Sequence, residues 1–228
     1  MPKLRSLEAI FRELNAEGIR YLVAGGVAVN VHGYQRMTQD LDLIVDLARE
    51  NVLGALRALG KLGYRPVLPV EAEDFADPAK RRAWVETKNL QVFSLTSEEH
   101  QDTTVDLFAG DPFSGRDEYA RAVLVEIAPA LEVPFVHLAT LIAMKEGTGR
   151  ARDSDDVEHL REIQTDLEAG PDRVRETGGW VAATWGGSRR EQLRRALRLS
   201  ASERLEGLEA LTETSERLKG IARPDGGP

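Results

Sequence analysis

The stretch YLVAGGVAVNVHGYQRMTQDLDLIVD, residues 21–46, decides the fold. It opens with four largely apolar residues, 21–24, which predict a buried strand. The glycine pair Gly25–Gly26 follows, then a short apolar helix over 27–31, a polar turn and the strand DLDLIV at 40–45. The stretch therefore predicts a strand–helix–strand unit, and the rest of the chain is interpreted around it.

Two carboxylates lie on the same face of the predicted DLDLIV strand. Side chains alternate between the faces of a strand, so Asp40 and Asp42 point one way while Leu41 and Leu43 point the other. Like charges on one face repel each other and raise each other's pKa unless a positive group lies between them. Hard oxygen ligands select Mg²⁺. We interpret the pair as a magnesium site; the alternative is two solvated aspartates on an edge strand.

The glycine pair indicates a place for phosphate. Gly25–Gly26 stands between a strand and a helix, where backbone N–H groups point outward and the helix dipole favours an anion. Glycine also allows close approach to the backbone because it has no side chain. A phosphate cradle beside a metal clamp is what a protein needs to bind a nucleoside triphosphate (NTP).

These residues resemble a known family. Gly25–Gly26, thirteen intervening residues and Asp40-Leu-Asp42 resemble the signature of the DNA polymerase β-like nucleotidyltransferase superfamily. The wider string GGVAVNVHGYQRMTQDLDL resembles its AbiEii branch, which contains toxins of toxin–antitoxin and phage-abortive-infection systems. The resemblance covers roughly residues 5–165. It implies an α/β fold (α+β) with a small mixed sheet flanked by helices, and transfer of a nucleotide from an NTP with the help of two Mg²⁺ ions.

The resemblance also implies a third carboxylate on a later strand, which serves as a metal ligand and as the base for the attacking group. Asp106 in TTVDLF fits that place, since Thr104 and Asp106 share one strand face. A solvent-facing strand aspartate is the alternative. The AbiEii-like pattern further implies a basic residue and a hydroxyl just before the aspartate pair, and these positions hold Arg36 and Thr38. Arg36 is expected to hold a phosphate or to be a solvated turn residue.

A C-terminal motif of the same branch is matched by Lys145, Arg152, Asp153 and Asp156. The resemblance implies that Lys145 touches the triphosphate and that the two aspartates support that corner of the site, and we count all three as nucleotide-binding candidates. Structural readings also fit these residues. A lysine at a helix C-terminus complements the helix dipole, and Asp153 is a natural N-cap for the helix that follows.

Composition limits the class of protein. The chain has 228 residues, 42% of them hydrophobic, and a net charge of −8, so the whole molecule is not a general nucleic-acid binder. No cysteine is present, which excludes a thiol nucleophile and a cysteine zinc site. We find no secretory or membrane-spanning segment, and we expect a cytoplasmic protein without a membrane partner.

Three parts are expected: a nucleotidyltransferase-like domain over 1–168, a helical extension over 169–220 and a disordered tail over 221–228. The expected helices cover 3–17, 48–62, 71–88, 114–121, 137–146, 154–164 and 188–218. The expected strands outside the central unit cover 89–95, 103–108 and 122–127. Residues 171–204 contain eight arginines against four acidic residues. That segment, with Trp180 and Trp185, is expected to be a solvated helix face and a pinned loop, or else a contact for RNA.

The predicted function is Mg²⁺-dependent transfer of a nucleoside monophosphate from an NTP to a tRNA or protein acceptor, by a toxin with an antitoxin partner. Three alternatives remain open at this point. A small-molecule nucleotidyltransferase would modify an antibiotic hydroxyl with the same core. A non-catalytic member of the fold would bind nucleotide or a partner protein only. A nucleic-acid-binding module would keep its affinity for tRNA without the two aspartates.

Overall fold

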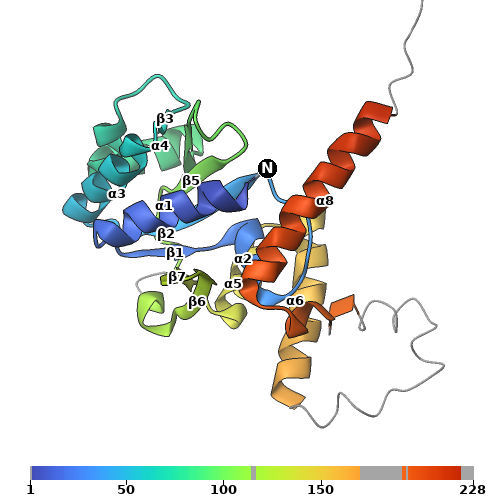
Figure 1. Cartoon of the computed structure of the whole chain (residues 1–228). Coiled ribbons are helices and arrows are strands. Elements are labelled where there is room, and N and C mark those ends of the chain that lie inside the picture. Colours follow the sequence, from blue (N-terminus) through green and yellow to red (C-terminus); the bar gives the residue numbers. More distant parts are fainter. Residues whose placement is uncertain (1, 114–116, 170–191, 194, 222–228) are drawn as a thin grey trace, which may run out of the picture.

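The computed structural model describes residues 2–113, 117–169, 192–193 and 195–221 (Figure 1). The helices are α1 (Leu4–Ala16), α2 (Gly25–His32), α3 (Arg49–Lys61), α4 (Pro78–Lys88), α5 (Leu138–Glu146), α6 (Ala151–Ala169) and α8 (Ala201–Ile221), with the 3-10 turns η1 (Ala72–Ala76) and η2 (Glu118–Arg121). The strands are β1 (Tyr21–Val23), β2 (Asp40–Val45), β3 (Arg65–Pro66), β4 (Val92–Thr96), β5 (Thr104–Phe108), β6 (Val123–Ala128) and β7 (Leu131–Phe135).

The seven strands form one mixed sheet in the order β3-β4-β5-β2-β1-β7-β6. Strand β2 lies in the middle, antiparallel to β1 and parallel to β5. Because β2 has a strand on each side, the reading of its aspartates as an edge-strand pair is excluded. The predicted α/β class, with a mixed sheet flanked by helices, is confirmed.

The alternation in β2 separates a packed face from a functional one. Leu41 and Leu43 are fully buried in the hydrophobic core, which they share with the apolar side of α1. On the same face of the sheet, Phe93 of β4 stacks against Phe75 at a ring-centroid distance of 4.6 Å. Figure 1 shows α3 and α4 at one side of the molecule and α5, α6 and α8 gathered at the other. The aspartates of β2 thus have a rigid support, because their neighbours in sequence are fixed in the core.

Strand β7 corrects the sequence analysis, which expected no element between 127 and the helix at 137. Leu131, Val133 and Phe135 are buried and Glu132 is exposed, the alternation of a strand. Pro134 concealed this pattern, because proline cannot donate a hydrogen bond to a neighbouring strand. The structure accommodates it because the only paired residues of β7 and β1 are Phe135 and Val23.

Two predicted helices are each broken at a capping residue. The expected helix 71–88 consists of η1 and α4, and the side chain of Asp77 accepts hydrogen bonds from Ala79 N and Lys80 N at the start of α4. The expected single helix 188–218 is also wrong, because the chain leaves the helix at 199–200 and α8 begins at Ala201. Ser200 and Glu203 bond to each other as a capping box there.

Helix α8 packs on the same core as the sheet. Leu205 and Leu208 are 2% and 1% exposed, and the Arg204 guanidinium donates to the carbonyl of Val31 near the end of α2. The expected division at 168/169 stays a prediction. Trp180, Trp185, Arg189, Arg190, Arg194 and the residues of the predicted tail from 222 on lie outside the described residues.

Of the arginines in the segment 171–204, the structure describes three. Arg195 and Arg198 are exposed, whereas Arg204 is partly buried. None of the helices within the described ranges is both long and apolar enough to cross a membrane.

We predict that Leu205→Ala destabilises the whole protein. Removing a buried leucine side chain costs about 2–4 kcal/mol, which lowers the melting temperature of a chain of this size by about 5–15 °C. Leu211→Ala is the matched control, because Leu211 is on the same helix and 44% exposed; its effect should be close to zero. Calorimetry of both variants measures the two melting temperatures. A separate low-temperature transition for α8, with the main transition unchanged, would contradict a shared core.

Candidate active site

The glycine pair forms a tight turn against two side chains. Gly25 has φ +60°, and a Cβ built on it would lie 1.7 Å from Asp42 Oδ2. A Cβ on Gly26 would lie 2.1 Å from Thr38 Oγ1 and 2.5 Å from Thr38 Cβ. No side chain fits at either position. The glycines are thus required by the close approach of Asp42 and Thr38 to the first turn of α2.

The three predicted carboxylates lie on adjacent strands. Asp42 of β2 is directly opposite Asp106 of β5, and Asp40 is opposite Thr104. Ser94 of β4 is opposite Asp106 on its other side. Asp106 Oδ1 is buried and has no hydrogen-bond partner in the part of the chain that the structure describes. A buried carboxylate oxygen without a partner is costly, and a cation or a hydroxyl donor would satisfy it.

Burial controls the protonation of Asp42. It raises the pKa of this carboxyl from 3.8 to about 7, and the charges of Asp40 and Asp106 act in the same direction. Lys145 and a hydrogen bond from the Gly26 N–H oppose the increase without cancelling it. The pKa of Asp106 is also raised, by burial and by Asp40, against a hydrogen bond from the Ser94 hydroxyl. The site is therefore short of positive charge close to its carboxylates.

Cations lie nearby but are held by other acids. Lys145 Nζ lies 2.9 Å from Asp153 Oδ1 and 2.7 Å from Asp156 Oδ2. Arg36 forms a bidentate pair with Asp156, with N–O distances of 2.5 and 2.6 Å. Burial alone would raise the pKa of Asp153, but hydrogen bonds from Thr148 and Lys145 lower it overall. Asp156 is fully buried and fixes the positions of both Lys145 and Arg36.

Residues 33–38, which we call the arm, connect α2 to β2. The arm brings two side chains to the glycine turn, since Thr38 Oγ1 and Arg36 Nη1 would lie 2.1 and 3.2 Å from a Cβ on Gly26. Arg36 also donates to the Met37 carbonyl at 2.9 Å, and Thr38 Oγ1 donates to Asp40 Oδ1 at 3.2 Å. The Arg36 side chain is only 12% exposed. The alternative of a solvated turn arginine is therefore excluded.

A cavity of about 250 Å³ joins these groups. Its walls include the glycine pair, the aspartate pair and several cations. The lining residues are Gly25, Gly26, Arg36, Thr38, Asp40, Asp42, Phe108, Leu141, Met144, Lys145, Thr148, Arg150, Arg152 and Asp153. Of the sequence-predicted site residues, eight line the cavity directly, whereas Asp106 lies beside Asp42 in the sheet and Asp156 lies behind Arg36 and Lys145.

The sequence did not lead us to the apolar residues that line the cavity, or to two of its polar and basic ones. Phe108 lies two residues after Asp106 on the same strand face, and Leu141 and Met144 precede Lys145 on one side of α5. The spacing of two along the strand and of one turn along the helix was enough to predict these residues. Arg150 and Thr148 come from the turn GTGRARD, where no periodic pattern indicates which side chains face inward.

The carboxylates present fit a magnesium ion only in part. Within the described ranges, no group of three or more His, Cys, Asp or Glu side chains is gathered closely enough to form a ready-made metal site. Mg²⁺ is usually held by one or two carboxylates together with water and substrate phosphates. Asp40 and Asp42, with the unpartnered oxygen of Asp106, match that pattern, and a triphosphate in the cavity would supply the remaining oxygens.

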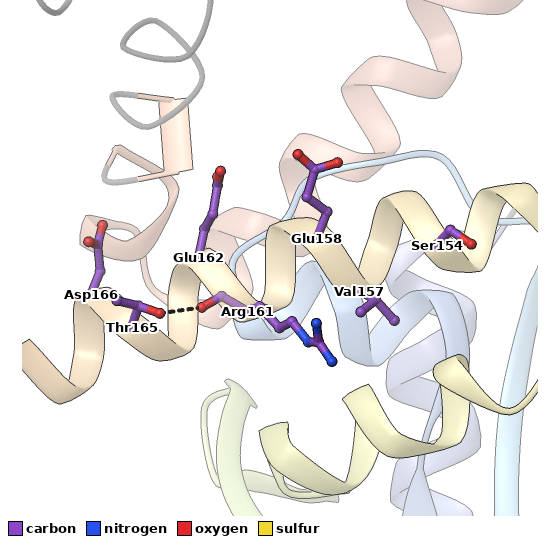
Figure 2. A pocket seen from close by; sticks show the side chains of 7 residues that line it. All are labelled: Ser154, Val157, Glu158, Arg161, Glu162, Thr165 and Asp166. Carbon is purple, nitrogen blue, oxygen red and sulfur yellow. Dashed lines mark hydrogen bonds between the residues drawn. The ribbon is translucent and has the colours of Figure 1, made fainter.

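A larger hollow of about 580 Å³ lies elsewhere, along α6 (Figure 2). Figure 2 shows that all seven labelled side chains come from this one helix, with Thr165 bonded to the backbone carbonyl of Arg161. Neither Gly25 nor Gly26 lines it, and none of Asp40, Asp42 and Asp106 does. Size alone therefore does not locate the functional site of this protein.

Comparison with known sequences identifies the class of protein. A family profile described as "Nucleotidyl transferase AbiEii toxin, Type IV TA system" matches residues 8–223. The protein is a nucleotidyltransferase. The chain belongs to the AbiEii nucleotidyltransferase toxin family. A search of curated protein sequences found no significant match.

Similar solved structures are distant in sequence. A lincomycin-bound lincosamide antibiotic adenylyltransferase, LnuA, matches 70% of this chain and 96% of its own, with 16% identity and a TM-score of 0.48. The solution structure of the antibiotic-resistance factor ANT(2'')-Ia matches 92% and 97%, with 13% identity and a TM-score of 0.46. Its crystal structure with adenylyl-2''-tobramycin matches 93% and 98%, with 12% identity and a TM-score of 0.40.

We predict that Gly26→Ala reduces nucleotide transfer at least about tenfold, because the new Cβ forces Thr38 and the arm away from the turn. Gly60→Ala is the control. The nearest atom to its Cβ is the Arg65 guanidinium at 3.6 Å, and alanine inside a helix is preferred over glycine by about 0.5–1 kcal/mol. Initial rates with labelled NTP test this. Full activity of Gly26→Ala would show that the arm does not depend on the turn.

We predict that Asp42→Asn stabilises the metal-free protein in a pH-dependent way. Folded Asp42 keeps a proton that the unfolded chain releases between pH 4 and 7, so the wild type loses stability as pH rises through that window. Three pKa units correspond to at most about 4 kcal/mol. The variant should melt higher than the wild type at pH 8 in EDTA, and equally at pH 4. A difference that is the same at both pH values would refute the raised pKa.

Proposed function

We propose that this protein transfers a nucleoside monophosphate from a Mg²⁺-bound NTP to a hydroxyl of a tRNA or protein acceptor. The observation that supports it best is the aspartate row of Asp42 and Asp106 beside a cavity that also contains Lys145, Arg36 and Arg150. Adjacent carboxylates attract metal, and the cations attract phosphates. Few ligands other than a metal-bound polyphosphate present both kinds of charge to one small cavity.

The proposed roles follow from position. Asp40 and Asp42 would hold Mg²⁺ with Asp106, and the ions when bound would neutralise charge on the reacting phosphate. The first turn of α2 is directed at the phosphates, although its Gly26 N–H is shared with Asp42. Lys145 is oriented by the buried carboxylate of Asp156 and would contact the triphosphate.

Asp106 would act as the base. Its unpartnered Oδ1 is available to accept the proton of an acceptor hydroxyl while the oxygen forms a bond to the α-phosphorus. The bond between the α-phosphorus and its bridging oxygen breaks in the same displacement, and pyrophosphate leaves with the electron pair. In the metal-free protein burial raises the pKa of Asp106, and a carboxylate with a higher pKa is a stronger base than an exposed aspartate.

The acceptor and partner are proposed from the family. The family is described as one of type IV toxin–antitoxin systems, and we propose a toxin whose target is tRNA or protein and which is opposed by an antitoxin. The net charge of −8 gives no general attraction to RNA, so tRNA recognition would depend on local positive surface.

We predict that Asp42→Asn and Asp106→Asn each reduce transfer at least about 100-fold, while both variants stay folded. The measurement uses each α-labelled NTP with Mg²⁺ and with tRNA or cell-extract protein as acceptor. Asp102→Asn is the control, because Asp102 pairs with Lys3 at the surface, at 2.9 Å. EDTA should abolish labelling and added Mg²⁺ should restore it.

The choice of acceptor distinguishes the proposed function from its alternatives. Labelling of an aminoglycoside or lincosamide hydroxyl, with none of tRNA or protein, would replace the proposed acceptor. Absence of labelling with every acceptor would indicate a non-catalytic member of the fold. Affinity for tRNA that survives loss of both Asp40 and Asp42, without transfer, would indicate a binding module.

A further inference from the structure

One buried amide connects the two halves of the active site. Asn30 of α2 is 0% exposed. Its Nδ2 donates to the carbonyl of Gly26 at 2.9 Å and to the carbonyl of Arg36 at 2.8 Å. Its Oδ1 accepts a hydrogen bond from the Arg36 N–H at 3.0 Å. The side chain therefore joins the glycine turn on one side to both backbone groups of an arm residue on the other.

Other contacts hold the arm on either side of Arg36. Tyr34 bonds to Asp155 and stacks on His159, and the Met37 carbonyl accepts a hydrogen bond from Arg152. The start of the arm is anchored to the end of α2 through the Gly33 and Tyr34 N–H groups.

Within the part of the chain that the structure describes, Asn30 is the partner of the Arg36 N–H and of the Arg36 carbonyl. The Arg36 guanidinium is fixed separately by Asp156. At Arg36, the Asn30 amide thus sets the distance between the glycine turn and the arm backbone.

Only an amide of this length suits the site. The three bonds require two N–H donors and one acceptor on the same planar group. Aspartate lacks the donors and would place an unpaired charge opposite two carbonyls. Alanine would remove the side-chain partner of the buried Gly26 carbonyl and of the part-buried Arg36 N–H and carbonyl, at a cost for each.

We propose that Asn30 is a positioning residue for nucleotide binding: it holds the arm so that Arg36 and Thr38 face the phosphates seated at Gly25–Gly26. This inference rests on the proposed function, since it assumes that an NTP occupies the cavity. Asn30 itself does not line the cavity and acts only through the backbone that it fixes.

The chain supplies a matched control. Asn51 of α3 makes the same three kinds of bond at the opposite end of β2. Its Oδ1 accepts from the Arg20 N–H at 2.8 Å, and its Nδ2 donates to the carbonyls of Arg20 and Asp46 at 3.0 and 2.9 Å. Asn51 therefore fixes the chain just before β1 and just after β2, whereas Asn30 fixes the chain between these two strands. Asn51, Arg20 and Asp46 do not line the cavity.

The kinetic test compares Asn30→Ala with Asn51→Ala in the full chain. Both variants lose three hydrogen bonds, so both should melt below the wild type. Only Asn30→Ala should raise the KM for NTP, by about tenfold, with a smaller change in kcat, because loosened phosphate contacts weaken binding in the ground state and the transition state alike. If both variants lower the melting temperature and leave the KM for NTP unchanged, Asn30 is a structural residue and the proposal fails.

A second measurement requires no catalytic activity, and its first part uses the wild type alone. In the wild type, the Arg36 amide should exchange its hydrogen at least about tenfold more slowly than a free loop amide, because Asn30 accepts its bond. In Asn30→Ala that protection should vanish, while Asn51→Ala retains it. Rapid exchange of the Arg36 amide in the wild type would overturn the proposal. If protection is observed but the wild type labels no acceptor, the proposed function fails and the Asn30 link to the arm remains.

Discussion

The structure of the site depends on the burial of Asp42 beside other carboxylates, with the nearby Lys145 paired to Asp153 and Asp156. The Asp42 carboxylate lies where any side chain on Gly25 would be, at the first turn of α2, and the neighbouring strand adds Asp106 in register. A buried ionised carboxylate is unfavourable unless it is paired, so the folded protein raises the pKa of Asp42 to about 7. A protein optimised only for stability would place an apolar residue there. The arrangement is understandable if the missing charge arrives with the substrate.

The cations around the cavity show a complementary arrangement. Asp156 binds Lys145 and Arg36 with both oxygens, and Asp153 binds Lys145 again. Buried ion pairs contribute little net stability, but loss of one partner is costly, because it leaves a buried charge uncompensated. The network therefore serves to fix the two cations in place. They face the cavity already oriented, so little side-chain entropy remains to be lost when a phosphate binds.

Much of this site was visible in the sequence because local patterns determine it. The alternation in DLDLIV places Asp40 and Asp42 on one face whatever surrounds them, and Gly25–Gly26 marks a turn that no other residue could adopt. Asp106 required the family resemblance, since strand pairing joins residues 64 positions apart and no local signal predicts the register. Asn30 was not noticed at all, because a polar residue in an apolar helix shows its role only when its partners are known.

The errors in the fold also have physical causes. Pro134 suggested the approach to a helix, but a proline fits a strand where few ladder bonds are needed, and β7 pairs with β1 at a single residue pair. The leucine spacing across 193–208 suggested one continuous helix, yet Ser200 and Glu203 start a new one. Capping residues outweighed hydrophobic periodicity in both broken helices, because they satisfy N–H groups that the periodic pattern does not address.

The contact between Arg204 and the end of α2 bears on the order in which the protein is made. The guanidinium that bonds to the Val31 carbonyl emerges from the ribosome 173 residues after it. Until then, the side of α2 against which α8 packs has no such partner. Helix α2 begins with the glycine turn of the active site. The support of the candidate active site is therefore incomplete until the ribosome has translated the chain as far as α8.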